Sequence, residues 1–570
     1  MRTAHLCILI LAATVAACKD KGSTPSTAAA NNADQSWSPA TLTSVAGVPE
    51  ADVEAALHKR LESDPPPNVD KHKWEHTKKL YKMYNNNPLW LAPDGLHKDR
   101  SRALTNAVLN AENDGLRMDT YPIGELAASI AALKQTDKPT ADQLARADVA
   151  LTAAYTSLAV DYLIGQVDPK TVSQSWHIDR HDENEDSAIV RSIRNPALDK
   201  SIAGMRPTDD DYAGLVKALA QFRSVAAKGG WPSIPEGKSV KPGESDNPAR
   251  LAALRARLGG EGIAVPAATD SAATRASNSS AYDRSLAGAV ANFQSRHGIV
   301  VDSMLGPETV KSLNLPATYR VGQIAANLER FRWLPRSFGS RYVYVNVPAF
   351  RLEAYDNSKK VLEMKVIVGE EYEDKATPVF ADSMEFVVFR PYWNVPPGIA
   401  EKEIFPKGSA YLASNNMETY SEGGATRVRQ RPGGKNALGL VKFLFPNDFN
   451  IYFHDTPNDE LFKKDVRAFS HGCIRLEHPD QMAEYALGWP GDQVHQAMEG
   501  GADNRQIKLP KKIPVYIVYG TAYLRDGQLY FGNDLYDRDG TLIKAVAGGA
   551  LPNPQTVQAV QALRRIAAAG

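Results

Sequence analysis

The stretch Ser470-His471-Gly472-Cys473-Ile474-Arg475 has residue types that suit nucleophilic catalysis. Gly472 permits a sharp turn that exposes the thiol of Cys473 and lets backbone N–H groups converge beside it. Such groups can hold the oxyanion of a tetrahedral intermediate. A free cysteine has a pKa near ~8.5, so only a few per cent is thiolate at neutral pH and a neighbouring base is needed. The stretch therefore predicts a cysteine nucleophile that requires a base.

A candidate base follows a β-rich run, Phe449–Phe453, which leads directly into His454-Asp455-Thr456-Pro457. Since strand side chains alternate, we expect one face to carry Asn450, Tyr452 and His454, and the other to carry Phe449, Ile451 and Phe453. Rigid strand ends are places where functional side chains are positioned. His454 is therefore the predicted base, and His471 is a second histidine at hand.

The N-terminus resembles a bacterial lipoprotein signal. Arg2 precedes an apolar run, Leu6 to Ala17, which is too short to span a bilayer and ends in Val15-Ala16-Ala17-Cys18. We expect residues 1–17 to be a signal peptide and Cys18 to be the lipidated mature N-terminus. Because Lys19, and not Asp, follows Cys18, the resemblance implies sorting to the outer membrane. The expected location is the periplasm, lipid-anchored to the cell envelope.

The cysteine count makes Cys473 unusual. The chain has three cysteines, of which Cys7 leaves with the signal and Cys18 carries the lipid, so Cys473 is the sole thiol expected in the mature protein. A lone thiol in an oxidising compartment is a candidate nucleophile or intermolecular link.

Length and composition predict several globular domains and no nucleic-acid partner. The chain has 570 residues, and single cores stop growing near ~250–300 residues. Hydrophobic residues make up 43% and charged residues 23%, which permits a buried core. Lys+Arg and Asp+Glu both number 66, so no net charge attracts nucleic acid.

The pattern along the chain predicts a multidomain α+β protein. Residues 18–45 lack large apolar groups and are expected to form a disordered tether. Helical periodicity, clearest at Ala141–Leu163, predicts a helical scaffold domain over 46–245, followed by a Gly/Pro-rich linker at Gly229 to Pro248. A small three-helix module is expected at 249–315.

After Pro316 the periodicity changes from 3.6 to 2, which predicts a mainly antiparallel β domain over 320–545 and leaves a helical tail at 546–570. The expected strands include Val343–Val347, Val361–Val368, Glu385–Phe389, Phe449–Phe453 and Val515–Tyr519.

A long connection at 396–444 interrupts these strands and is expected to cap the site. Its paired glycines and its cations Arg427, Arg429 and Arg431 suggest a mobile segment that binds substrate carboxylates.

The motif around Cys473, with His454 19 positions upstream, resembles the catalytic signature of the L,D-transpeptidase (YkuD) family. The resemblance implies that Cys473 is the nucleophile and that His454 is its base, oriented by a backbone carbonyl. It implies oxyanion or supporting roles for Ser470, His471, Gly472 and Tyr452. Arg475 would bind a substrate carboxylate by a bidentate contact.

Two further stretches extend this resemblance to the large Gram-negative type of the family. They are Tyr392-Trp393-Asn394-x-Pro396-Pro397, in which Trp393 and Asn394 would contact substrate, and the turn Ala437-Leu438-Gly439.

The 249–315 module resembles small peptidoglycan-binding modules. It carries Ala289-Val290-x-x-Phe293-Gln294-x-x-His297-Gly298, followed by Asp302, Gly306, Thr309 and Leu313-Asn314. Ser303 replaces the glycine expected after the aspartate, and the loop from Ala264 to Ser280 is long. A helical spacer without a ligand is the alternative interpretation.

The family resemblance implies a peptidoglycan L,D-transpeptidase that cross-links third-position diaminopimelate residues through a cysteine thioester, in cell wall biogenesis. The donor would be a tetrapeptide stem and the acceptor a diaminopimelate amine, with neither cofactor nor metal. Three alternatives stay open: a zinc site on His454, His471 and Cys473; a cysteine L,D-carboxypeptidase or endopeptidase; and a non-enzymatic lipoprotein that anchors membrane to peptidoglycan.

Overall fold

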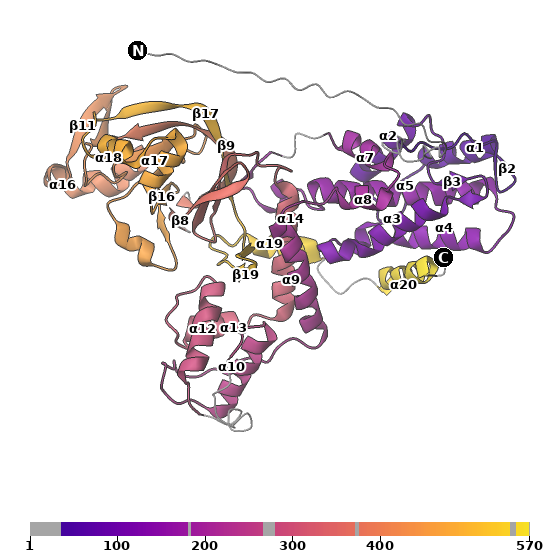
Figure 1. Ribbon diagram of the computed structural model, residues 1–570, viewed down its shortest axis with the longest axis horizontal. Helices are drawn as coiled ribbons and strands as arrows, with labels where there is room; N and C mark the ends of the chain where they lie inside the picture. The colour runs from indigo at the N-terminus through magenta and orange to yellow at the C-terminus, as the bar shows by residue number, and fades with distance from the viewer. Residues whose placement is uncertain (1–35, 180–183, 266–279, 371–374, 548–553, 569–570) are drawn as a thin grey trace, which may run out of the picture.

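The computed structural model describes residues 36–179, 184–265, 280–370, 375–547 and 554–568. The expected signal peptide, Cys18 and the tether up to residue 35 lie outside these ranges. The end of the expected tether is ordered, which corrects its bound of residue 45, because Leu42 and Val45 are buried in an apolar cluster of the scaffold. A helical scaffold and a β domain lie at opposite ends of the molecule, and a small helical module projects from between them (Figure 1). Along the described chain, no helix combines the length and apolar character needed to cross a membrane.

The scaffold is built around helix α5 (Ala141–Ile164), whose side chains from Ala147 onward are all buried. Thr140 and Gln143 form a capping box that starts this helix, and Gly165 ends it with a φ of 84°. The expected helix is therefore confirmed.

The other helices of the scaffold segment pack against α5, against one another or against elements that follow in the chain. They are α1 (Glu50–Leu61), α2 (Lys71–Met83), α3 (Lys98–Asn110), α4 (Ile123–Lys134), α6 (Pro169–Val172), α7 (Glu185–Ile193), α8 (Leu198–Ala203) and α9 (Asp210–Ala227), with short 3₁₀ turns η1 (Ala111–Asp114) and η2 (Met118–Thr120). Two small hairpins complete this domain, β1 (Ser44–Val45) with β2 (Val48–Pro49), and β3 (Leu91–Ala92) with β4 (Gly95–Leu96).

The small module consists of α10 (Pro248–Gly260), α12 (Arg284–Arg296) and α13 (Pro307–Leu313) around one apolar core. The predicted linker, Gly229 to Pro248, belongs partly to this module, which corrects the expectation. Ile234 and Val240 are buried in its core, and Val240 forms a β-bridge with Leu305. Isolated apolar residues in a Gly/Pro-rich stretch gave no periodic signal that could reveal this packing.

A helix, α14 (Ala317–Trp333), precedes the β domain, although the change in periodicity was expected directly after Pro316. It packs against α9 and α19 (Asp539–Ala547). Its buried polar side chains obscure the helical pattern, and one of them, Arg330, makes an ion pair of 2.7 Å with buried Asp539.

The predicted tail at 546–570 is part of two helices. The first, α19, begins earlier than expected, and the second, α20 (Pro554–Ala568), packs against α3 and α4 with Leu563 in the scaffold core (Figure 1).

The β domain is mainly antiparallel, as expected, and its sheet closes on itself. Its strands follow the order β13-β14-β16-β8-β7-β6-β17-β9, and β9 pairs with β13 to close the ring. Parallel pairs occur at β14–β16 and β6–β17. The strands are β6 (Tyr342–Asn346), β7 (Arg351–Asp356), β8 (Lys359–Gly369), β9 (Val379–Phe389), β13 (Val441–Leu444), β14 (Phe453–His454), β16 (Ile474–Leu476) and β17 (Arg505–Val518).

Additional elements surround this ring. They are β5 (Trp176–His177), which comes from the scaffold segment and pairs with β9; β15 (Ala468–Ser470), which pairs with β8; the 3₁₀ turn η6 (Asp459–Lys463); α17 (Pro479–Leu487) and α18 (Gly491–Glu499); and the hairpin β18 (Ala522–Arg525) with β19 (Gln528–Phe531).

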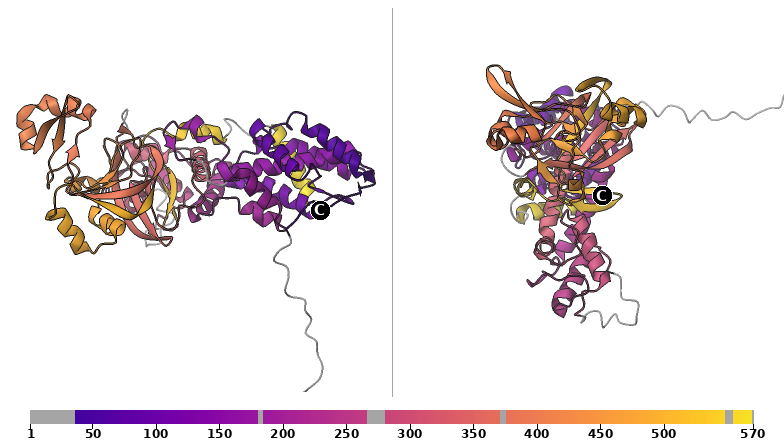
Figure 2. Two further views of the ribbon diagram at one scale, coloured as in Figure 1. Left: turned by 90° about the horizontal axis from the view of Figure 1, so that it is seen from above. Right: turned by 90° about the vertical axis from the view of Figure 1, so that its left-hand side faces the viewer.

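A cap projects from the ring, away from the scaffold (Figure 2). It contains β10 (Trp393–Asn394), α15 (Pro397–Ile399), the π-helical η4 (Ala400–Ile404), η5 (Phe405–Lys407), α16 (Gly408–Ser414), β11 (Met417–Glu422) and β12 (Ala425–Gln430). Gly423 and Gly424 turn the hairpin at φ of 60° and 80°, values that suit glycine.

The cap boundaries differ from the expected 396–444. The cap sheet starts with β10, which pairs with β12, and β13 belongs to the ring because it pairs with β9. Strands of two and four residues are too short for their alternation to reveal which sheet they join.

Candidate active site

The Cys473 thiol lies in the turn between β15 and β16. Ser470 shapes this turn, because its Oγ accepts a hydrogen bond from the Gly472 N–H at 3.1 Å and donates to the Cys473 carbonyl at 2.5 Å. Gly472 has a φ of 112°, and an added Cβ would lie 3.1 Å from Cδ1 of Ile451. The backbone conformation therefore favours glycine here, and an added Cβ would also press on the Ile451 side chain.

Strand pairing brings the predicted site residues to one face of the sheet. His454 of β14 is the register partner of Arg475 of β16, and the Ile474 N–H donates to the Tyr452 carbonyl at 3.1 Å. Tyr452 lies two residues before His454, and Cys473 lies two residues before Arg475. Because side chains alternate, all four face away from buried Phe453 and Ile474, which pack into the core.

The run Phe449–Phe453 is mostly a loop, which corrects the predicted strand. The Asn447 side chain bonds to the backbone of Phe445, Phe449 and Ile451 and folds this segment. Asn450 consequently adopts a φ of 56°, and its carbonyl, not its side chain, approaches the Cys473 Sγ at 3.6 Å. Asn tolerates this left-handed conformation better than most residues.

His454 is buried and held in one tautomer. Its Nδ1 lies 2.5 Å from the backbone carbonyl of Asp455. Since a carbonyl can only accept, Nδ1 carries the proton and Nε2 has the free lone pair. Burial, followed by the positive charges of Arg475 and Lys442, lowers the His454 pKa to about 3. The imidazole is therefore neutral at physiological pH.

The Asp455 carboxylate serves the neighbouring turn. It accepts hydrogen bonds from the N–H groups of Leu440 at 2.7 Å and Thr456 at 2.6 Å. Gly439 packs so closely that an added Cβ would overlap the carboxylate, and its φ is 60°. The predicted turn Ala437-Leu438-Gly439 therefore fixes the residue whose carbonyl orients His454.

Burial also sets the ionisation of the Cys473 thiol. It raises the Cys473 pKa to about 11, while hydrogen bonding from Tyr452 and the charges of Arg475 and Lys442 act in the opposite direction. The resting site is consequently a neutral thiol beside a neutral imidazole. In the described residues the Cys473 N–H has no hydrogen-bond partner, so it is available to an oxyanion.

Lys442 is a member of the site that sequence reasoning missed. It is the register partner of His454 on β13, and its Nζ lies 5.8 Å from the Tyr452 ring centroid. Burial lowers its pKa, and the nearby thiolate would raise it. Lys442 was missed because only the pairing of β13 with β14 places it beside His454, and that pairing cannot be predicted from the sequence.

Two predicted residues have partners that refine their roles. Arg475 is half-buried, and its Nη2 donates to the Phe469 carbonyl at 3.4 Å. His471 points to the cap, where its Nε2 lies 2.8 Å from a carboxylate oxygen of Glu403 in η4. His471 therefore connects the catalytic motif to the cap.

The three cap arginines pair with two carboxylates of their own hairpin, which leaves one positive charge in excess. Arg429 and Arg431 both pair with Glu418, at 2.6 and 2.5 Å, and Arg427 lies 3.5 Å from Glu422. These contacts occupy the arginines in this structure, and the binding of substrate carboxylates by the triplet stays a prediction. Like charges on one face of a strand were visible in the sequence, but their cross-strand partners were not.

The other predicted cap residues differ in burial. Trp393 is half-buried against the cap core, whereas Asn394 is exposed.

The zinc alternative is not supported by the geometry of this site. Among the described residues, the histidine, cysteine and acidic side chains that converge closely enough to hold a metal ion are His72, His76 and Glu185 of the scaffold.

Comparisons with known proteins concern the domain that contains these residues. Residues 340–514 match the L,D-transpeptidase catalytic domain of the YkuD family, and residues 75–219 match the family described as a scaffold domain. A Haemophilus influenzae protein whose name assigns it provisionally to the L,D-transpeptidases is 31% identical over 242 residues. That match covers 38% of this chain and 48% of the relative, so the chain spans about half of the relative's length.

Two solved structures are also similar. One is an L,D-transpeptidase from Xylanimonas cellulosilytica, at 13% identity, covering 50% of this chain and 99% of that one, with a TM-score of 0.15. The other is described as a fused Zn-dependent amidase/peptidase/peptidoglycan-binding domain-containing protein from Clostridium acetobutylicum, at 14% identity, covering 50% and 100%, with a TM-score of 0.16. Scores this low support no structural argument.

The Cys473 motif lies inside the region that matches the L,D-transpeptidase catalytic domain. The chain carries an L,D-transpeptidase catalytic domain joined to a scaffold domain.

Proposed function

We propose that this protein is a peptidoglycan L,D-transpeptidase that joins third-position diaminopimelate residues through a thioester on Cys473. The observation that carries the proposal is the shared face of Tyr452, His454, Cys473 and Arg475, with the free His454 nitrogen fixed by the Asp455 carbonyl.

The first half-reaction begins from the neutral thiol and imidazole. As Cys473 attacks the carbonyl of the third stem residue, its proton passes to Nε2 of His454. The Cys473 N–H and the Tyr452 hydroxyl stabilise the oxyanion. Collapse breaks the amide bond, and His454 returns the proton to the leaving amine of the terminal D-alanine.

The second half-reaction uses the thioester. The side-chain amine of an acceptor diaminopimelate attacks the thioester carbonyl, and the C–S bond breaks. His454 takes a proton from the amine and returns one to the departing thiolate. Hydrolysis differs only in that water replaces the amine.

Arg475 and Lys442 suit the charges of such stems. Both are cations on the site face, and burial lowers the pKa of each, since few water molecules solvate them. A stem carboxylate would stabilise these charges in place of the missing water. Arg475 can bind a carboxylate in bidentate fashion, and Lys442 can bind it as a point charge.

The cap is proposed to hold the substrate, and the remaining parts are proposed to hold the enzyme at the cell wall and the membrane. The cap would close over the stem through the His471–Glu403 contact. The module over 249–315 would bind peptidoglycan, and a lipid on Cys18 would hold the enzyme at the outer membrane. Cys18→Ala should abolish fatty-acid labelling in cells, and persistent labelling would refute the anchor.

The purified ectodomain and disaccharide-tetrapeptides provide the direct test. Mass spectrometry should detect cross-linked dimers that lack one D-alanine, and Cys473→Ala should form none. Disaccharide-tripeptide without dimer would instead identify a carboxypeptidase. No conversion of any kind would favour a non-enzymatic anchoring role.

A further inference from the structure

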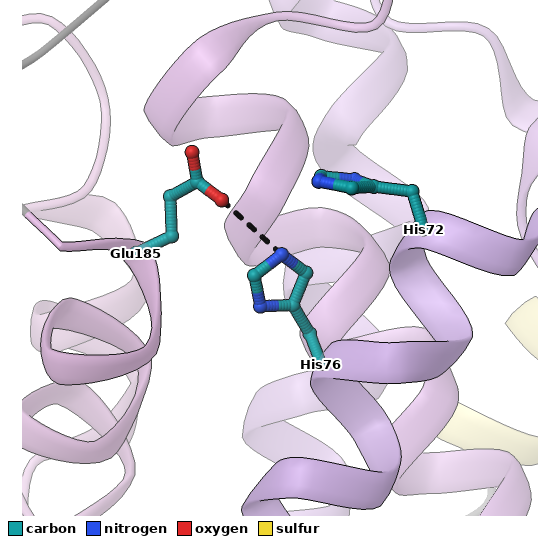
Figure 3. A group of neighbouring side chains, drawn as sticks. All are labelled: His72, His76 and Glu185. Carbon is teal, nitrogen blue, oxygen red and sulfur yellow. Dashed lines mark ion pairs between the residues drawn. The ribbon is translucent and has the colours of Figure 1, made fainter.

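A group of metal-binding side chain types lies in the scaffold, remote in sequence from the catalytic motif. His72 and His76 are four residues apart on α2, so their imidazoles share one helix face, and Glu185 begins α7 opposite them (Figure 3). One ligand atom from each lies within 4.8 Å of the other two. We propose that His72, His76 and Glu185 form a Zn²⁺ site that joins α2 to α7.

The surroundings of His76 are those of an oriented zinc ligand. Its Nδ1 lies 2.6 Å from the Asp186 carboxylate, and its Nε2 points to Glu185 Oε2 at 3.2 Å. Lys79 holds the other Asp186 oxygen at 3.0 Å. A carboxylate on one imidazole nitrogen fixes the tautomer that presents the other nitrogen to zinc.

The spacing of the donors can reach a zinc geometry with small side-chain movements. Ligands at ~2.0–2.2 Å in a tetrahedron lie about 3.3–3.6 Å apart, compared with the 4.8 Å limit seen here. His72 is exposed at the surface, and its ring centroid lies 4.8 Å from that of His76, so rotation of His72 can close the gap. Water would complete the fourth position.

The donor types select the metal. Two imidazoles and one carboxylate suit zinc, whereas Mg²⁺ and Ca²⁺ prefer oxygen ligands throughout. The simpler interpretation is an ion pair in which a protonated His76 bridges Glu185 and Asp186. That interpretation gives exposed His72 no part, so His72 distinguishes the two.

The site would stabilise the scaffold through α7. Ile189 and Ile193 of α7 are buried in the scaffold core, while Glu185 lies at the start of the helix. A metal bond from Glu185 to α2 would fix this end of α7 against the domain. The inference is independent of the reaction at Cys473.

Zinc titration of the full mature chain carrying Cys473→Ala tests the proposal, because this variant has no active-site thiolate to bind the metal. Calorimetry should find about one site, and Co²⁺ should give the visible absorption of a tetrahedral complex. His72→Ala should abolish both signals. Asp186→Asn should weaken zinc binding about 10- to 100-fold, as expected for loss of an orienting carboxylate.

His58→Ala is the matched control, since His58 is an exposed scaffold histidine on α1 that hydrogen bonds to Asn86. Zinc should raise the melting temperature of the parent and of His58→Ala, but not that of His72→Ala. Undetectable zinc binding by the parent, or equal binding by parent and His72→Ala, would overturn the proposal. Both outcomes leave the proposed transpeptidase activity untouched.

Discussion

The Nδ1 of His454 lies 2.5 Å from the backbone carbonyl of Asp455, while the Asp455 carboxylate bonds to the N–H groups of Leu440 and Thr456. Asp455 therefore orients the His454 imidazole through its main chain. This differs from a Ser-His-Asp triad, in which a buried carboxylate contacts the imidazole.

Asp455→Asn should consequently keep most of the activity. The amide retains one acceptor for the turn, and the imidazole contact does not involve the side chain. We expect a loss below about tenfold in kcat, compared with about 10⁴ when a triad aspartate becomes asparagine. Steady-state kinetics and the melting temperature check this. A loss of a thousandfold in a well-folded variant would mean that the carboxylate acts in catalysis.

The ionisation of Cys473 predicts slow alkylation of the free enzyme. With a pKa raised to about 11, only about one thiol in ten thousand is ionised at pH 7. The rate of reaction with iodoacetamide should therefore rise about tenfold per pH unit from pH 7 to 10. A model peptide should level off above its thiol pKa near ~8.5. A plateau below pH 8 in the protein would instead indicate a thiolate–imidazolium pair.

The neutral state of His454 has its own pH consequence. Because its pKa is lowered to about 3, its protonation should not appear near pH 6.5 in the profile of kcat/KM. The decline of kcat/KM on the acid side should begin only below pH 5, or it should coincide with unfolding. A clear loss of activity centred at pH 6.5, with the fold intact, would contradict the burial of His454.

The His471–Glu403 contact predicts a small effect on substrate binding. Glu403→Gln weakens an exposed contact worth at most about 1 kcal/mol, so KM should rise by no more than about fivefold with little change in kcat. His471→Ala should have the same effect, and the double variant should be no worse than either one.

Glu401→Gln is the control, because Glu401 is an exposed carboxylate on the same π-helical turn. Its KM should stay at the wild-type value. Additive losses in the double variant, or a large fall in kcat, would assign His471 a chemical role.

Much of this architecture was predictable because its signals are local. The periodic apolar residues of α5 and of the small module specify long helices, and the Cys473 motif with His454 pointed to residues that strand pairing brings to one face of the sheet. These features depend on spacing along the chain, which the sequence contains directly.

The parts that escaped prediction depend on contacts between distant segments. The pairing of Lys442 with His454, the capture of Arg429 by Glu418 and the return of α20 to the scaffold are set by tertiary packing. The strand expected at Phe449–Phe453 became a loop because the Asn447 side chain bonds to the backbone there. Hydrogen bonds from a side chain to the nearby backbone do not alter the spacing of apolar residues, so the sequence pattern does not reveal them.

The central claim is that Cys473 and His454 act as one metal-independent unit, and intact-mass analysis after incubation with a tetrapeptide donor tests it most directly. Wild type should gain the donor fragment without its terminal D-alanine, and should also gain one molecule of a carbapenem, whose strained lactam traps the thiol as a thioester. EDTA should change neither adduct.

Cys473→Ala, His454→Ala and the double variant should lose comparable activity, since groups acting as a unit are not additive. An adduct or cross-link formed by Cys473→Ala, or acylation that EDTA abolishes and zinc restores, would contradict the account.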